Sequence, residues 1–225
     1  MEIYHVLNRG VDKRKIFLDK KDYLRFIHDL YEFNDEEPAG AVFYYFNKYL
    51  DVRRPNIVEK KRRGRIVDLL AFCLMPNHYH LLLIPKKSEY LTLFMKKLNG
   101  GYAKYFNEKY QRIGALFERR FKRVLIKSER HFIHILYYIH SNPLDLKYSD
   151  WRKRILKNYE EALKFLEEYR WSSHLDYLGI KNFPSVTQRK FLLDFFGGER
   201  GYEESIENWF KTLDDLEKIK LWTLE

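Results

Sequence analysis

Two short stretches of the chain carry side chains that together are suited to hold a metal and attack a phosphate. In the first, His78 and His80 are separated by Tyr79, and residues two positions apart in a β-strand lie on the same face. Two imidazoles at this spacing can bind one divalent metal side by side. The alternative is a pair of strand histidines with ordinary hydrogen bonds, and the spacing alone leaves both interpretations open.

The second stretch is a helix expected over 128–141, near whose end Tyr138 and Asn142 stand four positions apart. At about 100° per residue, Asn142 lies about 40° from Tyr138 on the helical wheel. His131 and His134 fall on the same edge, beside a separate apolar arc that should dock on a sheet. Because the chain has 18 tyrosines, a tyrosine that only packs is the alternative interpretation of Tyr138.

The elements that must position these residues alternate between strand and helix patterns. Strands are expected at 3–8, 67–75, 78–85 and 117–126, and helices at 19–33, 89–110 and 128–141. The first six elements follow the order β-α-β-β-α-β. This order predicts an α+β, ferredoxin-like split β-α-β fold, in which an antiparallel sheet has helices on one face and the tyrosine helix follows the fourth strand.

Two regions fall outside this order. Residues 34–66 combine an acidic turn, an aromatic patch and a basic run, and we interpret them as an insertion in a domain that spans residues 1–145. The pattern becomes mostly helical afterwards, so residues 146–225 are expected to form a C-terminal helical appendage.

The charge balance favours a polyanionic partner. The chain has 225 residues, with 42 Lys and Arg against 32 Asp and Glu and a formal net charge of +10. Together with 17% aromatic residues, this composition is typical of a protein that binds DNA or RNA. A basic protein without a nucleic-acid role is the alternative on composition alone.

Several classes of protein are excluded by composition. Cys73 is the single cysteine, so there is neither a disulfide framework nor a cysteine-based zinc site. The apolar runs are shorter than the ~20 residues that a membrane helix needs. The first residues lack the three regions of a signal peptide, and the expected location is the cytoplasm, without a membrane partner.

The two stretches together resemble the signatures of a known family. MPNHYH at 75–80 and YIHSNP at 138–143 look like the two signatures of the HUH single-tyrosine transposases, with an IS200-like transposase domain. Within that group they are most similar to the REP-associated tyrosine transposases of bacteria. YHVLNRG at 4–10 and YRWSS at 169–173 are also similar to that family. Tyr79 is less plainly hydrophobic than the residue usual at its position.

The resemblance implies a reaction and a set of site residues. His78, His80 and Asn142 would bind a divalent metal, Mg²⁺ or Mn²⁺, and Tyr138 would be the nucleophile. The enzyme would be a DNA transposase that nicks and rejoins single-stranded or hairpin DNA, such as REP-like palindromes, through a 5′-phosphotyrosine intermediate. It would act as a monomer or homodimer. A site with two histidine ligands suits Mn²⁺ at least as well as Mg²⁺, because Mg²⁺ prefers oxygen donors.

Basic residues near both stretches are expected to contact DNA phosphates. These are Arg119, Arg120, Lys122, Arg123, Arg9, Lys13 and Arg14. The nearby aromatic residues either stack on unpaired bases or belong to the core. Two rival functions remain open: a protein that binds a DNA or RNA hairpin without cutting it, and a metal phosphodiesterase that needs no tyrosine.

Overall fold

The computed structural model describes residues 1–37, 64–148, 150–153, 156 and 158–211. Its centre is one sheet of four antiparallel strands in the order β2-β3-β1-β4. The strands are β1 (Tyr4–Arg9), β2 (Val67–Met75), β3 (His78–Pro85) and β4 (Lys122–Leu125). This arrangement confirms the predicted α+β fold with its split β-α-β topology.

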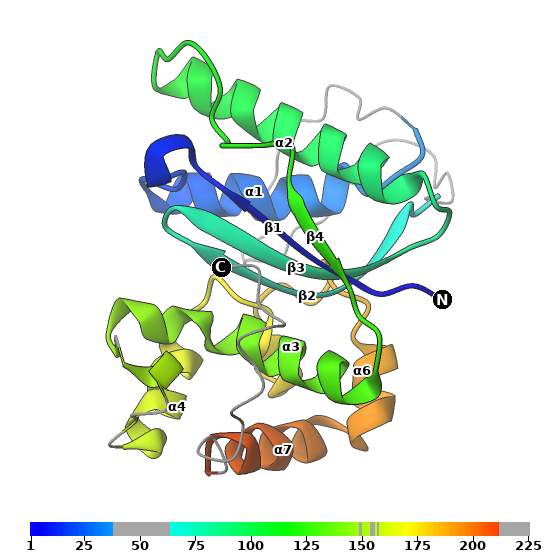
Figure 1. Ribbon diagram of the computed structural model, residues 1–225, viewed down its shortest axis with the longest axis vertical. Coiled ribbons are helices and arrows are strands. Elements are labelled where there is room, and N and C mark those ends of the chain that lie inside the picture. Colours follow the sequence, from blue (N-terminus) through cyan, green and yellow to red (C-terminus); the bar gives the residue numbers. More distant parts are fainter. Residues whose placement is uncertain (38–63, 149, 154–155, 157, 212–225) are drawn as a thin grey trace.

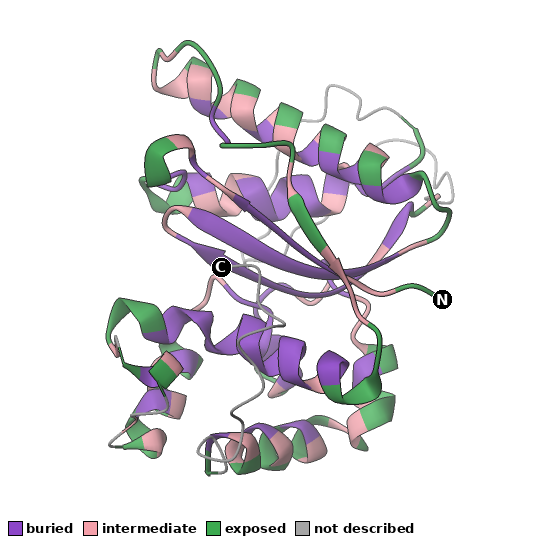
Figure 2. Cartoon of the chain, viewed as in Figure 1, coloured by how far each residue is buried: buried purple, intermediate pink, exposed green. Residues whose placement is uncertain are grey.

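Helices cover both faces of the sheet (Figure 1). The two helices of the split β-α-β unit, α1 (Lys20–Glu32) and α2 (Tyr90–Lys109), lie on one face. The helix that follows the fourth strand, α3 (Glu129–Ser141), lies on the opposite face against β2 and β3. Figure 2 shows α3 buried along most of its length, whereas β4 is largely exposed or half-buried.

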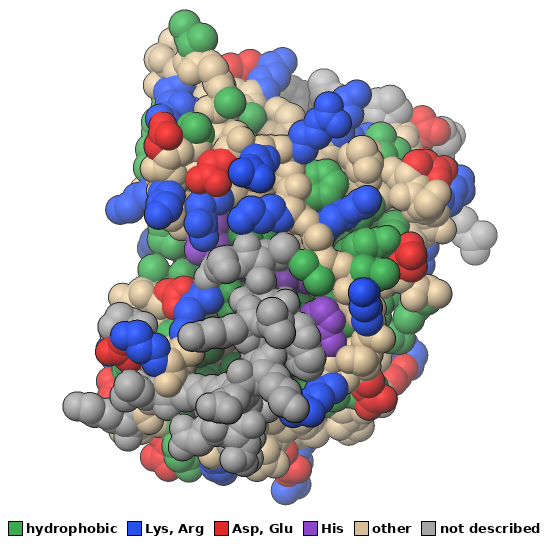
Figure 3. All heavy atoms as spheres, in the orientation of Figure 1, with side chains coloured by type: hydrophobic (Ala, Val, Ile, Leu, Met, Phe, Trp, Pro, Cys, Tyr) green, Lys and Arg blue, Asp and Glu red, His purple; other side chains and the backbone are tan. Residues whose placement is uncertain are grey.

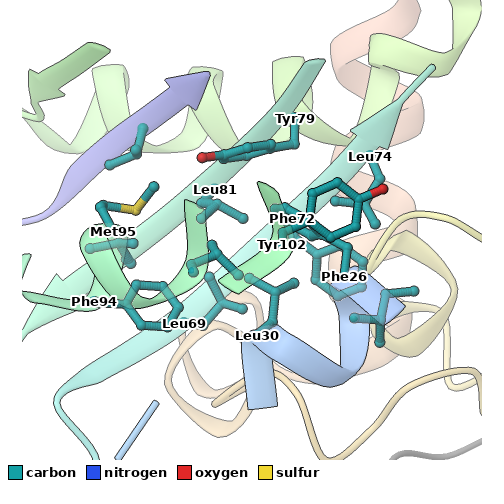
Figure 4. Packing of buried hydrophobic residues seen from close by; sticks show 14 of the residues in the cluster. Phe26, Leu30, Leu69, Phe72, Leu74, Tyr79, Leu81, Phe94, Met95 and Tyr102 are labelled. Atoms are coloured by element: carbon teal, nitrogen blue, oxygen red, sulfur yellow. The ribbon is translucent and has the colours of Figure 1, made fainter. Parts of the chain in front are cut away.

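The face under α1 and α2 is a sealed apolar core (Figure 4). Tyr79 and Leu81 of β3 point into it and meet Phe26 of α1 and Tyr102 of α2, and all four side chains are fully buried. The alternation of β3 therefore sends its odd-numbered residues to this core. It also sends the even-numbered residues, His78 and His80 among them, to the face of α3.

The remaining helices share a second core with α3 and the other sheet face. They are α4 (Tyr159–Glu168), α5 (His174–Tyr177), α6 (Lys190–Phe196) and α7 (Glu199–Lys211), with the short 3₁₀ helices η1 (Val11–Lys13), η2 (Asn142–Leu146) and η3 (Trp151–Lys153). A domain boundary at residue 145 stays a prediction. No helix within the described ranges is long and apolar enough to cross a membrane.

The C-terminal part of the chain also covers the outer edge of β2. The backbone N–H of Leu74 donates to Trp171 O at 2.9 Å, and that of Ser173 donates to Phe72 O at 3.0 Å. An exposed strand edge presents unpaired backbone groups that invite pairing with another chain. The stretch at 169–173 thus completes the edge of the sheet.

The two ends of the expected insertion at 34–66 meet beside the first residue of β2. The side chain of Asn34 accepts from Val67 N and donates to Val67 O, both at 2.9 Å. The backbone N–H of Glu36 donates to Gly64 O at 2.8 Å. Most of the insertion itself lies outside the described residues.

Candidate active site

The two strand histidines lie side by side on the α3 face of the sheet, as their spacing predicts. The ring centroids of His78 and His80 are 5.0 Å apart, with the rings nearly perpendicular. Both side chains are buried, and Tyr79 between them points into the opposite core. This placement explains why an aromatic residue is tolerated between the two histidines.

Each of the two imidazoles is hydrogen-bonded through Nδ1. His78 Nδ1 lies 2.6 Å from Asn77 Oδ1, and His80 Nδ1 lies 2.9 Å from His5 Nε2. The ring of His5 also stacks on His80, with centroids 5.1 Å apart. Bonds of this kind fix a ring's orientation and leave the Nε2 lone pair as the metal donor. The sequence analysis did not single out His5, although its place in YHVLNRG on a neighbouring strand was a usable signal.

The helix α3 brings Tyr138 against these histidines. Its ring meets His80 edge-on at a centroid distance of 5.7 Å, and His5 at 6.2 Å. Ser128 sets the register of the helix, because its hydroxyl caps the first turn by accepting from His131 N at 3.2 Å. The structure therefore joins the two stretches that the sequence analysis paired.

The other two histidines of the predicted helix edge are both buried. His134 lies one turn before Tyr138, with ring centroids 6.4 Å apart. Its other neighbour is Trp209 of α7, at 5.8 Å. His131 lies one turn earlier still in α3, where its backbone N–H is capped by Ser128.

Asn142 follows the last residue of α3, and both ends of its amide are engaged. Nδ2 donates to Tyr138 O at 2.8 Å, and Oδ1 accepts from Arg152 Nη2 at 3.0 Å. The amide oxygen of Asn142 is thus engaged by the guanidinium of Arg152. Within the described part of the chain, no three His, Cys, Asp or Glu residues are grouped to hold a metal. The metal ligands expected from the sequence, His78, His80 and Asn142, stay a prediction.

Arg152 of η3 is a site residue that the sequence analysis missed. Its Nη1 donates to Tyr138 Oη at 2.6 Å, and its guanidinium carbon lies 5.0 Å from the centre of that ring. Asp145 holds the guanidinium through Nε and Nη2, at 2.8 and 2.6 Å. Nothing in the sequence distinguishes Arg152 among 42 lysines and arginines, because its position depends on the path of η2 and η3.

Basic residues lie next to the histidines along β1 and β4. Arg9 stands opposite His78, and Lys122 stands opposite Leu7, which in turn pairs with His80. Residues directly opposite in an antiparallel pair share a face, so Arg9 and Lys122 lie on the histidine side. A hollow lined by Leu7, Asn8, Arg9, Glu118, Arg119 and Lys122 opens there.

A second hollow at the same end of β1 is lined by Val11, Asp12, Lys13, Glu118 and Arg119. Arg14 lies beside it, with Nε donating to Val11 O at 3.2 Å. In Figure 3, Lys and Arg side chains form a row across the sheet half, and histidine side chains are visible beside it. Most of the predicted DNA-binding residues thus gather near the histidines.

The predicted basic cluster is nevertheless divided between the two faces of the sheet. Arg123 pairs with Val6 and lies over the ring of Tyr4 at 5.7 Å, on the side away from the histidines. Arg120 is exposed, while its backbone carbonyl accepts from Asn8 Nδ2 at 2.8 Å. Lys122 and Arg123 therefore cannot serve one DNA strand on one surface.

The aromatic residues near this segment belong mainly to the core. Tyr102 is fully buried and Phe117 is 9% exposed, both within the apolar cluster under α1 and α2. Tyr105 and Phe121 pack against that cluster and are partly buried. Of the two interpretations, structural packing is confirmed for Tyr102 and Phe117.

The fold and the site together define a class: an α+β domain that places a histidine pair and a helix-borne tyrosine against each other on one sheet face. Residues 44–142, which contain both stretches, match the family model described as "Transposase IS200 like". This segment of the chain is similar to the IS200-like transposases, and the resemblance seen in the sequence is confirmed.

No curated protein sequence matches the chain. A solved structure described as "Structure of the REP associates tyrosine transposase bound to a REP hairpin" superimposes with a TM-score of 0.45 at 12% sequence identity, covering 82% of this chain and 83% of that chain.

Proposed function

We propose that the protein is a metal-dependent DNA transposase or strand transferase that nicks and rejoins single-stranded or hairpin DNA. The observation that carries the proposal is the edge contact of Tyr138 with His80, at 5.7 Å, inside a segment that is similar to the IS200-like transposases. A tyrosine that served only packing would not need two strand histidines beside it.

In this proposal Tyr138 is the nucleophile. Its Oη forms a bond to the phosphorus of the scissile phosphate while the P–O3′ bond breaks, which leaves a 5′-phosphotyrosine and a free 3′-OH. The energy of the phosphodiester is kept in the new ester. A 3′-OH can therefore attack the phosphotyrosine and rejoin DNA without ATP.

His78, His80 and Asn142 are the residues that would hold the divalent metal, Mg²⁺ or Mn²⁺. When bound, such an ion polarises the phosphate and stabilises the charge that develops on it. The hydrogen bonds to Asn77 and His5 support this role, since they orient both rings through Nδ1.

The basic residues around the two hollows would bind the DNA backbone. Arg9 supports this role because its Nε is buried and, among the described residues, has no hydrogen-bond partner. A phosphate oxygen would satisfy that donor. The resemblance to the REP-associated transposases indicates hairpin-forming, REP-like palindromes as the substrate.

The test is an incubation of the protein with a labelled library of single-stranded hairpins and Mn²⁺ or Mg²⁺, followed by a denaturing gel. A covalent protein–DNA adduct that disappears in Tyr138→Phe supports the proposal. Binding without an adduct or cleavage would instead support a hairpin-binding protein. Cleavage without an adduct would support a metal phosphodiesterase.

A further inference from the structure

The contact between Arg152 and the oxygen of Tyr138 has a chemical role within the proposed function. We infer that Arg152 is a further catalytic residue, whose guanidinium binds the phosphate that Tyr138 attacks and stabilises the tyrosine oxygen when DNA is rejoined. The inference rests on the proposed function and extends it to a residue outside the two sequence stretches.

The geometry places the guanidinium at the reacting atom. Nη1 of Arg152 lies 2.6 Å from Tyr138 Oη, and Nη2 of the same group lies 3.0 Å from Asn142 Oδ1. A phosphorus bonded to Oη would bring its other oxygens within reach of the same N–H groups. Arginine is suited to this contact, because its planar fork binds phosphate through two parallel hydrogen bonds.

Asp145 positions the guanidinium without sealing it from DNA. Its carboxylate accepts from Arg152 Nε and Nη2, and also from Trp151 Nε1 at 2.5 Å. The side chains of Arg152 and Asp145 are still 28% and 29% exposed. The arginine is thus held on the tyrosine side and remains accessible to a DNA phosphate.

The charge at this position is permanent. The side chains that contact the Tyr138 ring include His5, His80, His134, Trp151 and Arg152. Of these, only the arginine carries a charge that persists at every physiological pH. Preorganised positive groups stabilise the negative charge of a transferring phosphoryl group without reorganisation during the reaction.

The two directions of the reaction use Arg152 differently. In cleavage, the Tyr138 hydroxyl proton leaves to water, the Oη–P bond forms, the P–O3′ bond breaks, and O3′ takes up a proton. In rejoining, a 3′-OH gives its proton to water as it attacks phosphorus, and the P–Oη bond breaks. The departing tyrosine oxygen is stabilised by the hydrogen bond from Nη1 and then takes up a proton from water. Arg152 keeps all its protons throughout.

The experiment compares Arg152→Gln, Arg152→Lys, Asp145→Asn and Lys153→Gln in single-turnover reactions with saturating labelled hairpin. Arg152→Gln should slow adduct formation and rejoining about 100-fold, with the hairpin Kd and the Tm nearly unchanged. Arg152→Lys keeps the charge but loses the fork and should be about tenfold slow. Lys153→Gln is the matched control, because it removes a neighbouring charge whose side chain is 73% exposed, and it should react at the wild-type rate.

Each remaining outcome has one meaning. Asp145→Asn keeps the charge of Arg152 and only loosens its position, so it should slow the reaction less than Arg152→Gln does. If Arg152→Gln and Asp145→Asn lower both the Tm and the rate to the same extent, the arginine only ties η2 to η3 and the inference is wrong. The same holds if Arg152→Gln reacts at the wild-type rate, although the proposed function then stands. If Arg152→Gln does not fold, the reaction rate of Arg152→Lys is the test instead. A wild-type rate for Arg152→Lys overturns the inference. A wild-type protein that forms no adduct overturns both proposals.

Discussion

The two faces of the sheet are built from the same strands but serve different ends. In β3, Tyr79 and Leu81 point into a sealed core, while His78 and His80 point toward α3. One face of β3 is thus apolar and stabilises the fold by burial, whereas the other adds two buried histidines to a second apolar core. Because successive side chains of a strand alternate between its two faces, β3 contributes apolar residues to one face and histidines to the other.

A buried histidine is not by itself evidence of a catalytic site. Two other buried histidines on the α3 face, His140 and His174, show this. His140 and His174 both hydrogen-bond Tyr202 Oη through Nδ1, at 2.7 Å. Desolvation lowers the pKa of both, that of His174 to about 4. These histidines are neutral and tie α3 and α5 to α7, whereas His80 lies beside Tyr138 and His78 lies beside His80.

The largest expected effect is the difference in cleavage activity between substitutions of two neighbouring tyrosines, Tyr138 and Tyr137. Tyr138→Phe should abolish adduct and cleavage while hairpin affinity and folding change little, because only one oxygen is removed. Tyr137 points away from the histidines and donates to Ser205 Oγ at 2.5 Å. Tyr137→Phe should therefore stay active and lose about 1 kcal/mol of stability.

Denaturing gels and urea unfolding of both variants measure these effects. If the two variants behave in the opposite way, Tyr137 is the nucleophile and the assignment to the histidine side is wrong. If both remain active, metal-activated water becomes the better account.

The next effect contrasts the two faces of β3. The double variant His78→Ala with His80→Ala should abolish metal-dependent cleavage while keeping hairpin binding, since binding comes mainly from phosphate contacts. Tyr79→Phe, on the opposite face, removes the hydrogen bond to Asn99 and should lower stability while leaving cleavage intact. Cleavage at the wild-type rate by the double variant, with metal present, would refute the metal site.

The third effect concerns the histidine pair around Tyr202. His174 has a folded-state pKa of about 4, below its ordinary value, so the unfolded chain binds more protons between these two values. Stability should be complete above about pH 6.5 and fall as the pH drops toward 4, by up to roughly 1.4 kcal/mol per pH unit for each such histidine. Urea unfolding over this range should show a flatter pH dependence in His174→Gln. An equal slope in both proteins would contradict the assignment.

The smallest effect compares two adjacent cations on opposite faces. Lys122 lies on the histidine side, and Arg123 lies over Tyr4 on the other side. Lys122→Gln should reduce the slope of log affinity against log salt by ~0.7 for single strands, and Arg123→Gln should leave it nearly unchanged. Filter binding at several salt concentrations measures both slopes. A larger loss for Arg123→Gln would place the DNA on the face of α2.

Strand and helix periodicity predicted the order of elements and the faces on which His78, His80 and Tyr138 lie. The pairing of the two histidines with Tyr138 came from the resemblance of the two stretches to one family. The fourth strand was expected at 117–126 but spans Lys122–Leu125. The side chain of Asn8 explains the difference, because it donates to the carbonyls of residues 119 and 120 and so interrupts the strand ladder. Periodicity carries no information about such side-chain bonds.

Arg152 and Asp145 were missed for a related reason. Both lie in short 3₁₀ segments after the tyrosine helix, where no repeating pattern relates sequence to direction. Their place beside Tyr138 follows from how η2 and η3 turn back over α3. Local sequence could not predict that path, since it depends on packing between distant elements.

The bond from Glu36 N to Gly64 O has a practical consequence for engineering. It holds Glu36 and Gly64 at neighbouring positions, and Asn34 anchors the same point to β2. Closing a loop between fixed ends costs only about 0.6 kcal/mol more for each doubling of its length. A short glycine-rich linker that joins Glu36 to Gly64 would therefore span two neighbouring points without shifting the register of β2.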